Sequence, residues 1–462
     1  MFRKRSIYFW TISLFIFSPL FSSQNNSIYF INHLGSNTST PFWMQANRWG
    51  AHKGSRINLI FDYNFPKFKY LRFKGDILST GSNFQIIEGN FSLAVKNYQI
   101  RIGKIKYLHG IADHDLSSGS LIQSKNAEPI PKILLENSDP FIFNINKIRL
   151  LMNFGISHGL IEKGIYLSQP QLHEKWVNLK IKKNDLSLHF GLIHNAIFGG
   201  KTDEFGQLPG NLADFFRVFF VQNGAANAPI NEKINSLGNH LGIWDIGFSL
   251  DRKNYIFYAY HQHLFEDESG ARWLLNLKDG LYGITIEDKL NRLFIDKINI
   301  EFIYTLNQSG SKEVSENTYG WDDYYNHYVY LSGWTNKGRS IGTPFVVLGS
   351  NDARKYIHIE NNRIKVIHLG ISGKVHSKIS YKYLNSYSVN YGNYFDEDRL
   401  NILQLENKYS PPIKQFSGML EIYFNNLVKN KNLSFGIVFA QDIGGLYPDN
   451  SSFEISFKYQ IR

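Results

Sequence analysis

The chain has 462 residues, of which 15% are aromatic and 19% are charged, and it contains no cysteine. So much apolar mass excludes a disordered protein, and a helical membrane protein is excluded because only one apolar run approaches the roughly 20 residues that a spanning helix needs. The net charge of +11 could suit a nucleic acid, but the export signal described next makes that partner unexpected, so an anionic polysaccharide or lipopolysaccharide phosphate fits better.

Residues 1–23 have the pattern of a secretory signal peptide. Arg3, Lys4 and Arg5 precede an apolar stretch at residues 7–21, and small residues suited to cleavage follow it. An N-terminal anchor helix is the alternative, although the apolar stretch is short and Pro19 interrupts it. Export without cysteine leaves the fold without disulfide bonds. An exported, aromatic-rich chain of this kind suggests a bacterial outer-membrane barrel.

The dominant hydrophobic period is two, which predicts β-strands. At the C-terminus, Phe453, Ile455, Phe457 and Tyr459 alternate with polar residues, and similar alternation occurs at 177–182, 375–383 and 433–439. Alternation alone is compatible with a soluble sandwich as well as a membrane barrel. Strands of about 9–12 residues and an aromatic last strand favour the barrel, although the chain ends in Arg462 and not in an aromatic residue.

Short polar turns at 96–97, 183–185 and 252–254 join successive strands into hairpins. We therefore predict an all-β fold, an antiparallel up-and-down outer-membrane β-barrel of about 16–18 strands with long loops, a plug and a small helical part. The barrel is expected over residues 56–462. Residues 24–55 are expected to form an N-terminal periplasmic lead-in segment.

Three long connections interrupt this pattern. Residues 108–140 carry Pro129, Pro131 and Pro140, which argue against an ordinary barrel strand and suggest a plug. Residues 195–240 form a long insert with a helix predicted at 211–222, which Asn211 can cap. Residues 307–360 form a long loop. Inserts of this length are usually functional.

Two short motifs resemble catalytic or metal-binding patterns. Residues 155–159 read G-I-S-H-G and match the nucleophile motif around Ser157, but the helix that the nucleophile turn requires is not predicted after it. His261 and His263 lie on one face of a strand, near Glu266 and Asp267, without an evident third ligand. We expect no catalytic residue, no bound metal and no cofactor.

The candidate ligand site is an aromatic and carboxylate-rich segment. Aromatic rings stack on the apolar faces of sugars, and carboxylates and amides bond to sugar hydroxyls. An interfacial aromatic girdle is the alternative that needs no ligand. The candidate saccharide-binding residues are Trp321, Asp322, Asp323, Tyr324, Tyr325, Asn326, His327, Trp334 and Arg339.

Several sequence blocks between about residue 30 and the C-terminus resemble the Wzi-type capsule assembly proteins of Gram-negative outer membranes, in their Bacteroidetes-like branch. The blocks are PFWMQAN at 41–47, SGS at 118–120, NA at 126–127, PIP at 129–131, LGNHLG at 237–242, WD at 244–245, FED at 265–267, SG at 269–270, DDYYNH at 322–327, SGW at 332–334, GR at 338–339 and GTPF at 342–345.

The resemblance implies an outer-membrane β-barrel of about 18 strands, with segments that obstruct the lumen and some helix at the periplasmic side. It implies a protein that binds capsular polysaccharide and helps to attach it at the cell surface, and not an enzyme. The partners expected are capsular or other surface polysaccharide, outer-membrane lipid and lipopolysaccharide, with no nucleic acid, and we expect a monomer. The alternatives are a porin or substrate channel, and an enzyme built around Ser157 or residues 261–263.

Overall fold

The structure is a computed structural model that describes most of the chain. The described residues are 26–34, 40–51, 54–65, 68, 70–81, 83–272, 274–290, 294–309, 322–351, 354–394, 407–425 and 432–461. The predicted signal peptide at 1–23 and the candidate residue Trp321 lie outside the described residues.

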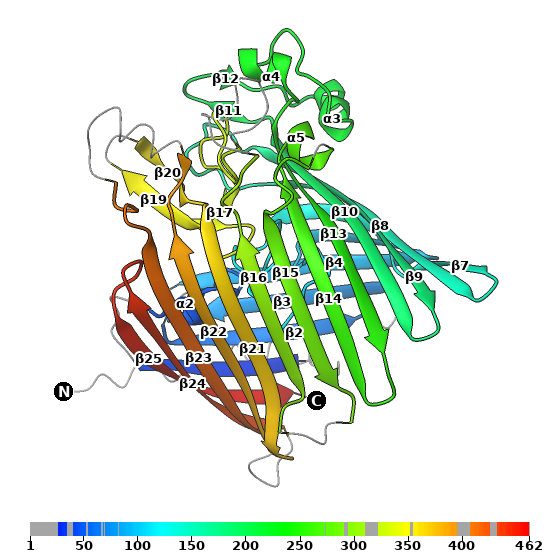
Figure 1. Cartoon of the computed structure of the whole chain (residues 1–462), viewed down its shortest axis with the longest axis vertical. Helices are drawn as coiled ribbons and strands as arrows, with labels where there is room; N and C mark the ends of the chain where they lie inside the picture. The colour runs from blue at the N-terminus through cyan, green and yellow to red at the C-terminus, as the bar shows by residue number, and fades with distance from the viewer. Residues whose placement is uncertain are drawn as a thin grey trace.

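The chain forms a closed antiparallel barrel of 18 strands in sequence order, as predicted (Figure 1). The barrel closes where β1 pairs with β25, with Asn26 opposite Ile461. The strands are β1 (Asn26–Leu34), β2 (Arg56–Asn64), β3 (Leu71–Ser79), β4 (Phe84–Val95), β5 (Tyr98–Lys104), β6 (Pro131–Asn137), β8 (Ile148–Leu160), β9 (Gln171–Lys183), β10 (Leu186–Phe198), β13 (Asn239–Asp251), β14 (Tyr255–Phe265), β15 (Gly280–Asp288), β16 (Lys297–Tyr304), β21 (Ile364–His376), β22 (Ile379–Asn390), β23 (Ile413–Asn425), β24 (Leu433–Gly444) and β25 (Asn450–Ile461).

The closing strand β1 was not expected from the sequence. It lies within residues 24–55, for which a periplasmic lead-in segment was predicted, and it pairs with both β2 and β25. The barrel therefore begins at Asn26 and not near residue 56.

Alternate side chains of each strand face opposite sides of the barrel wall. On β25, Phe453 and Phe457 are about half exposed, whereas Ser452 and Glu454 between them are buried. The large apolar side chains thus point outward, and the polar ones point into the lumen. Among transmembrane barrels this is the arrangement that lipid outside and a polar interior require.

One position in the barrel wall is occupied by a broken strand. β6 pairs with the second half of β8, and β7 (Phe141–Ile145) pairs with its first half. Pro140 immediately precedes β7, and proline cannot donate a hydrogen bond to the sheet, which accounts for the break. Part of the predicted plug at 108–140, namely residues 131–137, is therefore a barrel strand.

The two ends of the barrel differ in their connections. Short turns such as 96–97, 184–185 and 252–254 join the strands at one end. The long connections, 35–55, 105–130, 199–238, 266–279, 305–363 and 391–412, all lie at the other end, where Figure 1 shows the extra helices and hairpins. Outer-membrane barrels have short periplasmic turns and long extracellular loops, so the long-connection end faces outward from the cell.

The remaining elements lie in these long connections. They are α2 (Phe42–Gln45), α3 (Leu212–Phe219), α4 (Ile230–Ile234), α5 (Glu268–Ala271), and the short strands β11 (Lys201–Thr202), β12 (Gly206–Gln207), β17 (Thr335–Asn336), β18 (Arg339–Ser340), β19 (Val347–Asn351) and β20 (Arg354–Asn361). No helix in the described residues is long and apolar enough to cross a membrane.

The helix predicted at 211–222 is present but shorter, as α3. Its capping box is complete, because Asn211 accepts from the Asp214 N–H and Asp214 accepts from the Asn211 N–H. The described helices belong to connections at the long-connection end, whereas the family resemblance implied helix at the periplasmic side.

Candidate functional site

Residues 105–130, here called the lumenal segment, cross the inside of the barrel. Their backbone groups are paired by polar side chains that point inward from the strands. The Ile111 N–H donates to Asp245 on β13 (2.6 Å), and the Leu121 N–H donates to Gln262 on β14 (3.0 Å). Irregular backbone at this depth needs such partners because lipid and packed protein offer no water. Residues 108–130 of the predicted plug thus lie in the lumen.

The lumenal segment reaches further strands in the same way. The Ser118 N–H donates to Glu301 on β16 (2.6 Å), and the His368 ring on β21 lies 2.7 Å from the Leu116 carbonyl oxygen. At the start of α2, the Phe42 N–H donates to Asp442, which points inward from β24 (2.8 Å). Segments from two parts of the sequence therefore meet inside the barrel.

The half of the lumen toward the long connections is filled by a packed cluster, here called the lumenal core. It combines side chains of α2, the lumenal segment and the connection before β19, and it is continuous with the apolar residues at the outer ends of the strands. Its large members from the connections are Trp43, Leu121, Ile122, Tyr324, Tyr325, Tyr330, Trp334 and Phe345.

Three of the candidate saccharide residues belong to this lumenal core. Tyr324 and Trp334 are 0% exposed and Tyr325 is 1% exposed. The Trp334 indole N–H donates to the Ile122 carbonyl (3.0 Å), and the Tyr325 hydroxyl donates to the Leu121 carbonyl (2.9 Å). No face of these rings is open to a sugar, so the predicted stacking role is wrong for them. They hold the connection before β19 onto the lumenal segment.

The polar candidates also bond within the protein. The Asn326 side chain donates to the Ile359 carbonyl (2.8 Å), and Asp323 accepts from Asn362 (2.6 Å). The His327 ring accepts from the Tyr330 N–H (3.3 Å), and Arg339 donates to the Gln45 carbonyl (3.0 Å). These four side chains are only partly buried, so they stay candidates for a ligand at the outer end.

Buried carboxyl groups surround Tyr324. Burial raises the pKa of Asp322 to about 7, with a further contribution from the negative charge of Asp267. Burial likewise raises the pKa of Asp279 to about 6, and it raises the pKa of Glu266 well above its usual value. These groups hold protons more tightly in the folded chain than in the unfolded one, so we expect the stability of the lumenal core to fall as the pH rises.

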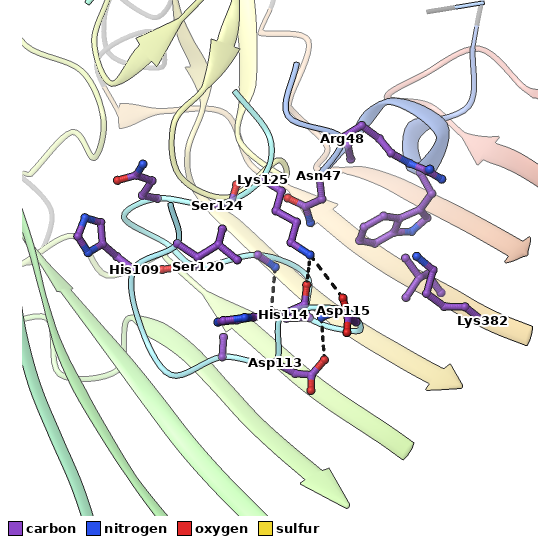
Figure 2. A pocket seen from close by; sticks show the side chains of 18 of the residues that line it. Asn47, Arg48, His109, Asp113, His114, Asp115, Ser120, Ser124, Lys125 and Lys382 are labelled. Carbon is purple, nitrogen blue, oxygen red and sulfur yellow. Dashed lines mark hydrogen bonds and ion pairs between the residues drawn. The ribbon is translucent and has the colours of Figure 1, made fainter. Parts of the chain in front are cut away.

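Below the lumenal core lies a pocket, here called the lumenal pocket, with about 630 Å³ of space, part of which is open to solvent. Figure 2 shows the lumenal segment on one side of it, with Asn47 and Arg48 on another and Lys382 of β22 at the barrel wall. Gly119 makes the tight turn at its edge with φ +108°. A Cβ there would lie 3.0 Å from the Ser124 Cβ, which explains the glycine.

Charged groups line the lumenal pocket in pairs. Arg48 and Lys382 both contact the buried Glu421, at 2.6 and 2.9 Å. Lys125 lies 3.6 Å from Asp115 and also donates to the His114 carbonyl. Asp113 also lines the pocket, but it is paired with Lys297 (3.0 Å). The excess positive charge is therefore local to Arg48 and Lys382, which share the single carboxylate of Glu421. An acidic group on a ligand would be attracted there.

Several polar atoms at the lumenal pocket have no hydrogen-bond partner in the described residues. They are the Trp43 indole Nε1, the Asn47 Oδ1, the Ser120 hydroxyl and the Gln123 Oε1. Ser120 and Gln123 are each only 6% exposed. A buried polar atom is costly unless a partner satisfies it, and ordered water or a hydroxyl-rich ligand could do so. This combination of amide, hydroxyl, indole and charge is suited to binding a saccharide unit.

A second pocket, with about 820 Å³ of empty space, lies on the other side of residues 111–115. It is lined by Tyr258, Thr285 and Lys297, which belong to the half of the barrel near the short turns. Asp115, which borders both pockets, has a side chain that is 76% exposed. The lumen is therefore packed in its outer half and hollow in its inner half.

The two motifs that resemble catalytic or metal sites both lie in strands of the barrel wall. Ser157 lies within β8, is buried, and donates its hydroxyl to Glu174, which is ion-paired with Lys132. His261 stacks on Tyr282 at 4.1 Å, and its side of β14 is the outward one. Among the described residues, no group of three or more histidines and carboxylates could hold a metal ion.

The family model for the capsule assembly protein Wzi matches residues 17–356. The chain belongs to the Wzi family of capsule assembly proteins. Family membership and the closed barrel together place this Wzi-family chain in the outer membrane. A search of curated proteins gave no match to the sequence.

One solved structure supports this fold. It carries the description "Wzi, an outer membrane protein involved in group 1 capsule assembly in Escherichia coli, is a carbohydrate binding beta-barrel". Its chain is 13% identical, the TM-score is 0.58, and the match covers 98% of this chain and 87% of that one. The chain is more distantly similar to Pseudomonas aeruginosa OccK10, which is 9% identical with a TM-score of 0.42, covering 95% and 98% of the two chains.

The residues of the lumenal pocket were missed as a site by sequence reasoning. Two of the Wzi-like blocks, at 41–47 and 118–120, contribute Trp43, Asn47, Gly119 and Ser120 to it. The blocks signalled that these positions resemble the family, but nothing local in the sequence showed that they meet.

Proposed function

We propose that this Wzi-family protein binds capsular or another surface polysaccharide and helps to hold it at the cell surface. Family membership supports the role, as does the fold that it shares with a carbohydrate-binding barrel. The observation that carries the proposal furthest is the lumenal pocket, which is lined by amide, hydroxyl and charged side chains and has polar atoms without protein partners buried in its wall.

We place one saccharide unit of the polymer in the lumenal pocket. Its hydroxyls would bond to Ser120, Gln123 and Asn47, and the nearby Arg48 and Lys382 would favour a unit that carries a carboxylate. The pocket is built from one chain, which is consistent with a monomer. Lipid would contact the outward apolar side chains of the strands. No step in this function needs a catalytic residue or a cofactor.

The packed lumenal core argues against the alternative of an open porin. Diffusion through a barrel needs a continuous water-filled path, whereas the outer half of this lumen contains fully buried rings such as Tyr324 and Trp334. Planar bilayers that contain the intact protein should therefore show little conductance. Stable open steps would favour a channel.

The cellular test is removal of the gene. Cells without the protein should still export their polysaccharide but should release it into the medium, because the attachment that we propose is lost. Restoring the intact gene should return the polymer to the cell surface. Accumulation of the polymer in the periplasm would contradict the proposal and would indicate a role in export.

A further inference from the structure

The insert between β10 and β13 folds over the outside of the barrel. Outward positions on these strands are the ones that carry half-exposed apolar side chains, such as Val177 on β9 and Phe190 on β10. By the same alternation His158, His173 and Phe198 also point outward, at the ends of their strands near the long connections. These three side chains are the surface on which α3 packs.

One face of α3 is fixed to this outer surface. The Phe215 ring lies 5.7 Å from the His158 ring and 5.1 Å from the His173 ring, measured between centroids. Val218 packs with Phe198 in a small buried cluster. Lys175, which also points outward from β9, donates to the Phe219 carbonyl. These contacts hold the helix to the outward side of the strands, at the end of the barrel where Figure 1 shows α3 near the ends of β8 and β10.

Next to this packed face, α3 carries a further row of apolar side chains that nothing in the described residues covers. Leu212, Phe216 and Phe220 lie at i, i+4 and i+8, and they are 73%, 51% and 62% exposed. A surface helix normally exposes polar side chains to water, so an apolar surface that extends beyond the packed face needs a second apolar neighbour.

The lipid-facing band of the barrel continues directly below this face. Further along the same strands, the outward positions are occupied by Val177, Phe190, Ile246 and Phe248, each more than 40% exposed. The exposed face of α3 therefore extends an established lipid-facing surface upward at the outer end of the barrel. Aromatic side chains are typical of this interfacial depth.

We propose that α3 is an interfacial helix whose Leu212, Phe216 and Phe220 insert among the acyl chains of the outer leaflet. Such a helix lies in the plane of the membrane surface with its apolar side in the lipid. Because the packed face of α3 is tied to three adjacent strands, β8, β9 and β10, this insertion would anchor the insert and fix how deeply the outer rim sits in the membrane.

The test uses the absence of cysteine from the chain, which allows one fluorophore to be placed at a chosen residue. Three full-length variants are labelled and reconstituted into phosphatidylcholine bilayers: Phe216→Cys on α3, Ile246→Cys on the lipid-facing wall, and Lys337→Cys on an exposed turn at the same end. Each is measured with nitroxide-labelled acyl chains and with iodide in the water, and again with lipopolysaccharide added to the bilayer.

We expect the nitroxide lipids to quench the label at Phe216→Cys nearly as strongly as the label at Ile246→Cys, with iodide having little effect on either. The label at Lys337→Cys should show the reverse. Quenching of Phe216→Cys by iodide alone, in both bilayers, would overturn the proposal. Disulfide-linked dimers through Phe216→Cys, or energy transfer between copies that grows with the ratio of protein to lipid, would also overturn it by identifying a second copy as the partner.

Discussion

The lumenal core and the lumenal pocket are adjacent but differ in how their polar atoms are used. In the lumenal core, Trp334 and Tyr325 donate to backbone carbonyls of the lumenal segment, and their rings are buried. In the lumenal pocket, Ser120 and Gln123 present buried oxygens that have no partner within the described chain. A satisfied network stabilises one shape, whereas unsatisfied groups around a cavity can bind something else.

The same difference gives separate roles to two regions that have similar amino-acid compositions. Both regions are rich in aromatic, amide and carboxyl groups, which are the groups that contact sugars. Only the pocket combines them with empty space. We therefore assign closure of the barrel to the core and ligand binding to the pocket.

The largest effect is expected from removing Trp334. Trp334→Ala leaves a cavity in the lumenal core and an unpaired Ile122 carbonyl, so the free energy of unfolding should fall by about 3–5 kcal/mol. Urea unfolding in detergent measures this loss, and planar bilayers should show new conductance as the core loosens. Lys337→Ala, at an exposed position of the same connection, should change stability by less than about 0.5 kcal/mol. Wild-type stability and conductance in Trp334→Ala would refute the assigned closure.

The next largest effect should come from Glu421, which is buried and pairs with two cations that line the pocket, Arg48 and Lys382. Glu421→Gln removes the charge that Arg48 and Lys382 share, and breaking such a buried pairing costs about 3 kcal/mol. The two freed cations should at the same time bind an acidic polysaccharide more tightly, with a stronger dependence on salt. Asp185→Asn, which breaks an exposed pair with Arg252, serves as the control and should cost less than about 1 kcal/mol. Unchanged salt dependence in Glu421→Gln would argue against an acidic ligand in the pocket.

A smaller effect is expected from pH, through the carboxyl groups around Tyr324. Burial raises the pKa of Asp322 from 3.8 to about 7, so its protonated form is favoured by folding. This contribution is complete below about pH 4 and is lost as the pH rises through 7, at up to about 1.4 kcal/mol per pH unit. Once the intrinsic pH dependence of amide exchange is divided out, the protection of residues 322–346 should therefore be greater at pH 5 than at pH 8. Asp322→Asn should reduce the difference, and an equally steep dependence in that variant would show that Asp322 is not its source.

The smallest effect concerns a third region, α3. Asn211→Ala removes the side-chain cap of the helix and should cost about 1 kcal/mol locally. Faster hydrogen exchange in residues 212–216 measures this loss. Because α3 lies outside the barrel wall, conductance and polysaccharide binding should remain unchanged. A change in either one would mean that the stability of α3 is coupled to the structure of the lumen.

Sequence patterns predicted the parts of the fold that depend on neighbouring residues. The alternation in β9 and β10 and the short turn between them predict a hairpin, because register and facing are local properties. The cap of α3 was predicted for the same reason. β1 was missed because one of its two partners, β25, lies at the far end of the chain. Its segment carries too little alternation to be recognised without that partner.

The candidate site was harder to predict because burial is not a local property. The composition of 321–328 suits a sugar platform or a packed core equally well, and only the contacts of Tyr324 and Tyr325 with other segments decide between them. The lumenal pocket draws on residues from α2, the lumenal segment, β22 and β23. No single stretch of sequence contains enough of them to reveal it.

Calorimetric titration of the full-length protein with polysaccharide extracted from the surface of its own cells tests the central claim most directly. Wild-type protein should bind, and the double variant Ser120→Ala/Gln123→Ala should bind about thirtyfold more weakly, since each of the two lost hydrogen bonds contributes about 1 kcal/mol. Ser377→Ala, at an exposed short turn, should bind as wild type does. Absence of binding by the wild type, or equal binding by the double variant, would contradict the account.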